Sequence, residues 1–549
     1  MKRWNGWGDT SIHFPLSESA ALFLENKIGK FIAFPDTAFE TALGGVGAPS
    51  SSLIPHPLIQ MDSEQRLLHA RGQSLPDWIA LRSGRISTFP DGVAFPINSE
   101  EIRTLLDHTR RTDTRLIPYG GGTSVVGHIN PLPGDSPVVT VDLSRLNQLF
   151  QLDEDSHLAT FGAGVRGPDL EAALRERGYT LGHFPQSFEY STLGGWIAAR
   201  SSGQQSYYYG RIEDLFAGGH VETPVGSLDL PSLPASAAGP DLRQIILGSE
   251  GRLGIITQAT MRIRPLPESE DFFGVFFKDW ESGVRAVRAT AQANLPLSMV
   301  RLSDSDETQA NLALAGTSRL SDLAGRGLSW LGYGPERCLL IYGVTGTHQE
   351  TPRSRRQAES LFRSFGGLPT GTLAGNAWRQ NRFLTPYLRN TLWDCGIAVD
   401  TLETAVPWAK VFPLTQAIKS ATTESIAETG ERALVIAHLS HVYGDGASIY
   451  VTYLFRRTED PDELLEHWHK MKNAASQAIV AHGGTISHQH GVGRDHVPWL
   501  EAEKGALGMA TLAAIGRRLD PAGLMNPGVL LPGDGVDVAD RAADRGTGR

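Results

Sequence analysis

The chain of 549 residues is too long for one compact hydrophobic core, so we expect two or three domains. Hydrophobic residues make up 40% and charged residues 20%, the proportions of an ordinary globular protein. The formal net charge of −10 argues against a general nucleic-acid-binding protein, which would present a basic face.

No targeting signal stands out in the sequence. The N-terminal segment MKRWNGWGDTSIHF has basic residues but no apolar stretch after them, and no run approaches the length of a membrane span. The two cysteines, Cys338 and Cys395, lack the spacing of a metal site or a disulfide framework. We therefore predict a cytoplasmic protein; peripheral membrane contact and a homodimer stay open as further hypotheses.

Turn residues and periodic segments divide the chain into five parts. Residues 1–90 form an N-terminal arm, and residues 91–267 alternate strand, glycine turn and helix. Residues 268–455 mix strand-like and helical runs, which predicts a second α+β domain that forms a cap. Residues 456–535 are mainly helical, and the charged, glycine-rich residues 536–549 are predicted to be disordered.

The segment from residue 99 to residue 120 shows the alternation in the second part. Ser99, followed by Glu100 and Glu101, predicts a helix start, because acidic residues in a first turn suit the helix dipole. Apolar residues then recur at helical spacing: Ile102, Leu105 and Leu106. RLIPYG follows as a short buried strand that enters a turn.

The first of three glycine-rich segments is PYGGGTS, residues 118–124. Successive glycines after a strand expose backbone N–H groups that can cradle a pyrophosphate, and Thr123 and Ser124 add hydroxyl donors. The segment is neither a Rossmann turn nor a P-loop, because it lacks both sequence patterns. A plain turn is the alternative to a phosphate site.

Two further glycine segments follow in order. In GHFPQSFEYSTLGGW, residues 182–196, hydroxyl side chains lead into a glycine pair and a helix. GSEGRLGIIT, residues 248–257, ends in a β-branched run that should form a strand. Glycines at this spacing permit close approach of the backbone to a flat ligand. Three such loops predict convergence on one large anionic cofactor.

A fourth segment, GGTISHQHGVGRD at residues 483–495, sets His488, Gln489 and His490 between glycines. Histidine titrates near neutral pH and can handle protons. If the segment is extended, the two histidines project to the same side. We predict that they face a bound ligand; a polar surface loop is the alternative.

The segments PYGGGTSVVG, FPQSFEYSTLGGWIAARSSG and LGSEGRLGIIT resemble the FAD-binding domain of the vanillyl-alcohol-oxidase and PCMH-type flavoproteins. The resemblance implies two α+β subdomains that hold FAD and a cap domain over the flavin ring. We expect non-covalent FAD, because the loop from Gly120 to Gly127 has no histidine or cysteine, although His128 lies just beyond it. The implied FAD-binding residues are Pro118, Gly120, Gly121, Gly122, Thr123, Ser124, Gln186, Ser187, Ser191, Thr192, Gly194, Gly195, Ala199, Ser202, Glu250, Gly251, Leu253, Gly254 and Ile256.

Motifs along nearly the whole chain resemble the alkyldihydroxyacetonephosphate synthase family: MKRWNGWG, YYYGRIEDLF, VRLSDSDE, DTLETAVPW, GDGASIYVTYLF and the histidine segment. The resemblance implies an FAD-dependent transferase of ether-lipid synthesis that works without net redox. The fatty acid of acyl-dihydroxyacetone phosphate would leave, and a fatty alcohol would take its place through an adduct at flavin N5. The substrates would thus be lipids or small molecules.

The same resemblance implies roles for five side chains. Tyr450 would handle a proton, Arg389 would hold substrate charge and Arg301 would organise the site. His488 and His490 would act as acid, base or orienting groups. A tyrosine is a weak base at its ordinary pKa of about 10, so an imidazole is the expected partner. Simple packing on a strand is the alternative for the tyrosine of SIYVTYLF.

Gln489 stands where the synthase family has the middle of three histidines, and glutamine cannot exchange a proton near neutral pH. A second hypothesis is therefore a metal-independent FAD-linked 2-hydroxyacid oxidase or dehydrogenase of the D-lactate or glycolate type. The metal-binding pattern of such relatives falls on Val442, Ile449 and Gln489, which are poor ligands, so we predict no metal site. A non-catalytic FAD-binding subunit is a third hypothesis.

Overall fold

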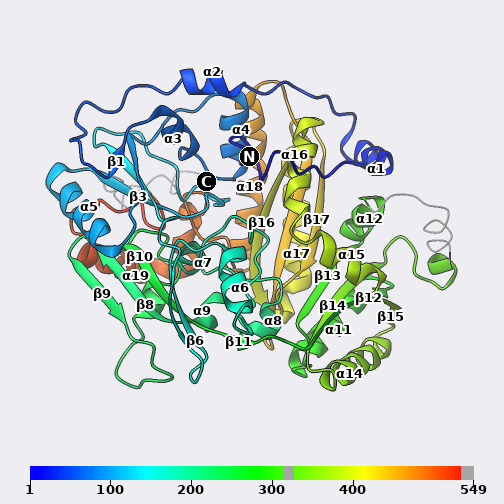
Figure 1. Ribbon diagram of the computed structural model, residues 1–549. Helices are drawn as coiled ribbons and strands as arrows, with labels where there is room; N and C mark the ends of the chain where they lie inside the picture. Colours follow the sequence, from blue (N-terminus) through cyan, green and yellow to red (C-terminus); the bar gives the residue numbers. More distant parts are fainter. Residues whose placement is uncertain (315–326, 533–549) are drawn as a thin grey trace.

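The structure is a computed structural model that describes residues 1–314 and 327–532. It has the predicted α+β class, with two small sheets in one half of the molecule and a large sheet in the other (Figure 1). The predicted disordered tail, residues 536–549, lies outside the described residues.

The half with the three glycine segments contains two main sheets. The first has the order β1-β2-β4-β3, in which β2, β4 and β3 are parallel. The second is antiparallel, with the order β5-β6-β10-β8-β9, and a short pair joins β7 to β11. The strands are β1 (Ile59–Gln60), β2 (Gly92–Ala94), β3 (Arg115–Tyr119), β4 (Val138–Asp142), β5 (Leu149–Asp153), β6 (Leu158–Gly162), β7 (Tyr179–Thr180), β8 (Phe216–Thr223), β9 (Gly226–Leu230), β10 (Ile255–Arg262) and β11 (Arg264–Pro265).

The helices of this half follow the predicted local signals. The helix expected at Ser99 is α5 (Ser99–Thr112), and the side chain of Asn98 caps it by accepting a hydrogen bond from the Glu101 N–H at 2.8 Å. The strand expected in RLIPYG is β3. The other helices are α6 (Gly167–Arg175), α7 (Leu193–Ala199), α8 (Ser206–Tyr209), α9 (Ile212–Leu215) and α10 (Arg243–Ile246).

The large sheet has seven antiparallel strands in the order β15-β12-β14-β13-β17-β18-β16. Alternate residues of a strand face opposite sides. One side packs with two long helices into the largest hydrophobic core, so the other side is left facing the glycine segments. The strands are β12 (Ser269–Phe277), β13 (Met299–Ser303), β14 (Cys338–Gly346), β15 (Leu368–Gly371), β16 (Ile397–Pro407), β17 (Ala433–Leu439) and β18 (Gly446–Arg456).

Helices cover the large sheet and its edges (Figure 1). The two long helices of the core are α17 and α18. In this part of the molecule the helices are α11 (Trp280–Gln292), α12 (Ser305–Leu314), α14 (Glu350–Ser364), α15 (Leu373–Asn381), α16 (Thr385–Asp394), α17 (Trp408–Ala427) and α18 (Pro461–Ala481). Helix α19 (Val497–Leu519) lies in the other half, beside β8 and β10 (Figure 1). The N-terminal arm contributes α1 (Glu18–Ile28), α2 (Phe39–Gly44), α3 (Ser63–Leu68) and α4 (Leu75–Ser83).

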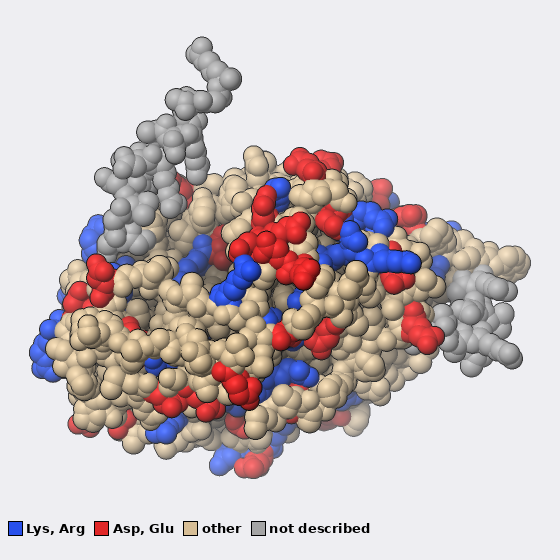
Figure 2. Space-filling view, turned by 90° about the horizontal axis from the view of Figure 1, so that it is seen from above, with Lys and Arg blue, Asp and Glu red and all other residues tan. Residues whose placement is uncertain are grey.

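The surface carries acidic and basic side chains interspersed on the face shown in Figure 2. Within residues 1–314 and 327–532, none of the helices combines the length and the apolar character needed to cross a membrane.

Candidate active site

One cavity of about 2320 Å³ lies between the glycine segments and the open face of the large sheet. All the residues predicted to bind FAD line this cavity except Leu253. Leu253 is buried with 5% of its surface exposed. Three loops that are far apart in the sequence therefore meet at one ligand-sized space.

The first glycine segment lines this cavity with its backbone groups. A Cβ on Gly121 would lie 1.7 Å from the carbonyl oxygen of Tyr190, so only glycine fits there. The Lys2 ammonium donates a hydrogen bond to the Gly121 carbonyl oxygen at 3.2 Å. In a trans peptide the C=O and the following N–H point in opposite directions. Lys2 thus fixes the peptide plane that orients the Gly122 N–H.

Buried polar atoms without a protein partner also face the cavity. Within the described chain, the cavity-lining residues whose side-chain oxygens lack a hydrogen-bond partner are Ser202, Gln204, Glu307 (Oε2), Gln489 and Asn526. Such groups are costly to bury unless something pairs with them. A polar ligand with several donors and acceptors is the kind of molecule that would satisfy them.

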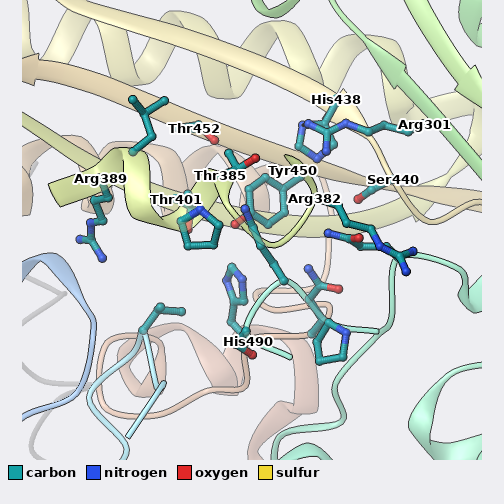
Figure 3. Close-up of a pocket in the computed structure, with 18 of the residues that line it drawn as sticks. Arg301, Arg382, Thr385, Arg389, Thr401, His438, Ser440, Tyr450, Thr452 and His490 are labelled. Atoms are coloured by element: carbon teal, nitrogen blue, oxygen red, sulfur yellow. The ribbon is translucent and has the colours of Figure 1, made fainter. Parts of the chain in front are cut away.

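The register of three strands brings the reactive side chains together. Tyr450 on β18 lies opposite Glu403 on β16 and opposite His438 on β17. Cross-strand partners share one face of a sheet. Figure 3 shows Tyr450 and His438 side by side, with His490 directed at them from the facing loop. The Tyr450 ring stacks on His438 with centroids 4.9 Å apart and meets His490 edge-on at 5.6 Å.

Burial controls the protonation of this cluster. Burial raises the pKa of Tyr450 to about 12, and the nearby Glu403 and Asp400 carboxylates add to the effect. Burial lowers the pKa of His490, against the pull of Glu403. At neutral pH the phenol therefore keeps its proton and the imidazole is neutral, so His490 can accept a proton while Tyr450 donates a hydrogen bond.

Arg301 is tied to its neighbours. Its Nη2 lies 2.8 Å from Glu307 Oε1 and 3.3 Å from His438 Nδ1. Burial acts to raise the pKa of Glu307, but His438 and Arg301 outweigh it and lower that pKa to about 2. Arg301 is thus neutralised by a carboxylate and holds the ring that stacks on Tyr450.

Arg389 keeps unpaired donors. Its Nη1 donates to the Gln73 carbonyl oxygen at 2.5 Å, whereas Nε and Nη2 are buried without a partner in the described part of the chain. Burial lowers its pKa to about 10, so it is still charged at neutral pH. Arg382, which the sequence did not single out, also lines the cavity, with Nη1 3.0 Å from the Gln205 side-chain oxygen. Each arginine can attract an anion to its part of the cavity, and Figure 3 shows them on opposite sides of Tyr450.

Two carboxylates hold the histidine segment in place. Glu403 accepts hydrogen bonds from the backbone N–H groups of His488, Gln489 and His490 at 2.8–3.0 Å, and from the Ser487 hydroxyl at 2.9 Å. Sequence reasoning missed this residue. The one available signal was a charged residue inside the strand-like run DTLETAVPW.

Glu250 holds the other end of the same segment. It accepts from the N–H groups of Val492 at 2.5 Å and Gly493 at 2.8 Å, and its own φ of 53° lies in the left-handed region. A Cβ on Gly491 would lie 2.7 Å from Glu250 Oε1, so a glycine is needed beside the carboxylate. Glu403 and Glu250 therefore fasten the segment to both halves of the molecule.

The structure separates the two histidines. Because three consecutive N–H groups of the segment converge on Glu403, the backbone is not extended, and the expected same-side projection is wrong. His490 and Gln489 line the cavity. His488 lies behind it, with Nε2 2.6 Å from the Tyr443 hydroxyl and 2.7 Å from Arg211 Nη1.

The cavity changes character along the open face of the sheet. Next to Tyr450 the lining is polar: Thr452 lies two residues along the same strand, β18, and Thr401 is its cross-strand partner on β16. Two or more residues further along each strand the lining becomes apolar. This apolar section is built by Val399, Leu434, Ile436 and Leu454 of the sheet, Phe23 and Leu24 of α1, and Leu388 and Leu392 of α16.

Metal ligands do not gather in this region. Across residues 1–314 and 327–532, no three His, Cys, Asp or Glu side chains are placed to hold a metal ion. Val442 and Ile449 are buried and apolar, as the sequence implies.

Comparisons with known proteins match both halves of the chain. Residues 90–229 match the FAD binding domain, and residues 266–530 match the C-terminal domain of FAD linked oxidases. The chain is 32% identical to the alkyldihydroxyacetonephosphate synthase of Caenorhabditis elegans, over 95% of this chain and 94% of the relative. It is 28% identical to an uncharacterized FAD-linked oxidoreductase of Escherichia coli, over 79% and 87%. A solved alkyldihydroxyacetonephosphate synthase structure has a TM-score of 0.81 at 27% identity, covering 96% of this chain and 98% of that chain.

Proposed function

The chain belongs to the PCMH-type family of FAD-linked oxidases, with FAD as its cofactor, and from this membership we propose that it is an ether-forming transferase. In this proposal the fatty acid of acyl-dihydroxyacetone phosphate leaves and a fatty alcohol replaces it. The observation that carries the proposal is one cavity that joins the FAD loops, the Tyr450–His490 pair and the apolar section. A phosphorylated head and a long chain would each find matching surface there.

The residues of the cavity suit FAD itself. The exposed N–H groups of the first glycine segment fit a pyrophosphate, and the unpaired buried oxygens of Ser202, Gln204 and Asn526 fit the edges of a flavin. Non-covalent binding is part of the proposal. His128 has Nδ1 2.8 Å from the Ser124 hydroxyl, and its Nε2 lies 3.0 Å from the Glu250 carboxylate without a hydrogen bond in the described part of the chain.

The side chains divide the work of the exchange. Bound FAD supplies the electrophilic centre of the reaction. Arg389 binds the substrate phosphate through its unpaired Nε and Nη2. Neutral His490 accepts the proton of the incoming alcohol, and Tyr450 donates a hydrogen bond to the oxygen that carries developing charge. The apolar section holds the alkyl chain, where burial contributes about 0.8 kcal/mol per methylene group.

The test incubates the purified FAD-loaded protein with acyl-dihydroxyacetone phosphate and a labelled fatty alcohol. The expected result is a labelled ether product and one free fatty acid per turnover. Release of fatty acid without any ether product would contradict the proposal.

A second candidate is an FAD-linked 2-hydroxyacid oxidoreductase. The similarity to an uncharacterized oxidoreductase of Escherichia coli and the glutamine at position 489 favour it. Its signature is loss of the flavin colour on anaerobic addition of D-lactate or glycolate. Loss of colour without ether product assigns this function. If the protein gives neither ether product nor loss of colour, the remaining candidate is a non-catalytic FAD-binding subunit.

Peripheral contact with a membrane belongs to the same proposal. Trp330 and Leu373 line the cavity and are 89% and 83% exposed, so they stand at its mouth. Exposed apolar side chains at the mouth would dip into a bilayer and admit a lipid. The double variant Trp330→Ser, Leu373→Ser is expected to reduce co-sedimentation with phosphatidylcholine vesicles about tenfold. Leu507→Ser is the matched control, because Leu507 is 81% exposed on α19, and equal losses in both variants would refute the proposed contact.

The contact of Lys2 with the first glycine segment predicts an effect on FAD affinity. Lys2→Met removes the donor to the Gly121 carbonyl, and we expect FAD to bind about fivefold to tenfold more weakly, roughly 1 kcal/mol. Flavin fluorescence titration of the apoprotein measures the change. Lys30→Met, which removes an exposed ammonium from the same arm, should leave the affinity unchanged. An unaltered affinity in Lys2→Met would show that this peptide plane is held without Lys2.

A further inference from the structure

A second pocket of about 650 Å³ lies next to His441 and His488, whose side chains hydrogen bond to its lining residues Ser206 and Tyr443. Ser206, Arg211 and Tyr443 contribute to its lining. Exposed residues at its edge, such as Asn294 and Arg264, place it in contact with solvent. The lining residues of the two spaces are different, so a layer of side chains separates solvent in this pocket from the reacting groups.

His441 bridges that layer. It lines the main cavity, yet its Nδ1 lies 2.9 Å from the hydroxyl of Ser206, which lines the second pocket. Backbone hydrogen bonds with Ser448 fix its position: the His441 N–H donates to the Ser448 hydroxyl at 3.1 Å, and the Ser448 N–H donates to the His441 carbonyl at 2.8 Å.

The imidazole is neutral over the working range of pH. Burial, with Arg211 nearby, lowers the pKa of His441 to about 3. A neutral imidazole has one donor and one acceptor nitrogen, so it can take a proton on one side and release a proton on the other. His488, whose ring stacks on His441 at 5.1 Å, contacts the second pocket through Tyr443 but does not line the main cavity.

The proposed exchange must export a proton. An ester and an alcohol give an ether and a carboxylate, so one proton is left over in each turnover. Oxidation of a 2-hydroxyacid by FAD likewise releases one proton when the reduced flavin is anionic. The Tyr450–His490 pair is half-buried in the cavity wall, and a proton held on His490 must leave before the next turnover.

We propose that His441 and Ser206 form a proton relay from the main cavity to the second pocket. A proton enters at His441 Nε2, the proton on Nδ1 passes to the Ser206 oxygen, and the hydroxyl proton of Ser206 passes to water in the second pocket. Only N–H and O–H bonds form and break, and one proton crosses the layer. A rotation of the imidazole ring that carries its N–H from the cavity side back to the Ser206 side, with the reverse reorientation of the hydroxyl, completes the cycle. The inference rests on the proposed function for the source of the proton.

The test uses the full chain loaded with FAD. Ser206→Ala and His441→Gln are expected to lower kcat at least about tenfold, with KM and FAD affinity unchanged, because one proton transfer typically contributes this much or more. The solvent deuterium isotope effect on kcat should rise in both variants. Ser206→Thr keeps the hydroxyl and should restore the rate. Added imidazole, which can enter from the second pocket, should rescue His441→Ala.

Tyr443→Phe is the matched control, because it removes a hydroxyl of the second pocket that contacts His488 and leaves His441–Ser206 intact. It should turn over with an unchanged isotope effect. If the wild type makes the ether product and both Ser206→Ala and His441→Gln keep its rate and isotope effect, the relay is overturned and the proposed function stands. Absence of ether product from the wild type overturns the proposed function instead, and the variants are then compared in the 2-hydroxyacid reaction. No turnover there would overturn the relay as well.

Discussion

Replacement of Tyr450 by phenylalanine is expected to lower turnover by about 100-fold or more, while FAD stays bound, because a positioned proton donor or acceptor contributes roughly 10²–10⁴ to a rate. The change removes one oxygen and preserves the ring that stacks on His438 and meets His490 edge-on. The site should therefore keep its shape and lose only the hydroxyl that meets the developing charge.

The comparison that isolates this effect is Tyr453→Phe. Tyr453 is buried on the same strand but points to the other side, where its hydroxyl donates to Asp400 at 3.0 Å. That variant should lose stability without losing flavin or a comparable factor in kcat. Ether formation and the flavin absorption spectrum are measured side by side for the two proteins. An unchanged rate in Tyr450→Phe would remove this hydroxyl from the mechanism and leave the tyrosine a packing role.

Replacement of Glu403 by alanine is expected to cost roughly 3–5 kcal/mol of unfolding free energy, because several buried N–H groups lose their acceptor together. The carboxylate is 2% exposed and accepts from three consecutive backbone N–H groups of the histidine segment. Its loss should also release His490 from the Tyr450 ring. Chemical denaturation measures the stability, and kcat measures the release.

Two further variants separate charge from shape at this position. Glu403→Gln keeps the size and one acceptor oxygen, so it should fall between the wild type and Glu403→Ala in both measurements. Glu424→Ala, at an exposed position of α17, is the control and should change stability by less than about 0.5 kcal/mol. Full stability in Glu403→Ala would mean that water or the loop itself replaces the carboxylate.

The cofactor loops were predictable because their signals are local. In PYGGGTS and the two later segments, neighbouring residues supply both the turn and the exposed N–H groups, so the sequence shows the chemistry without the fold. The helix at Ser99 and the strand in RLIPYG were predictable from the sequence for the same reason. The tertiary structure adds that these loops line one cavity.

The candidate catalytic centre depends on contacts that are distant in the sequence. Glu403 lies 85 residues before His488, and nothing in DTLETAVPW indicates which N–H groups its carboxylate will meet. The antiparallel register of β16, β17 and β18 decides that Glu403, His438 and Tyr450 share a face.

The sequence by itself determined the cofactor, the fold class and the set of polar residues available for chemistry, because short motifs specify them. Only the tertiary structure decided that His490 faces the cavity, that His488 lies behind it, and that His441 reaches Ser206 across 235 residues of chain. Those assignments depend on which carboxylate accepts hydrogen bonds from the N–H groups of a loop, and on which strands pair. Both are properties of the folded chain alone.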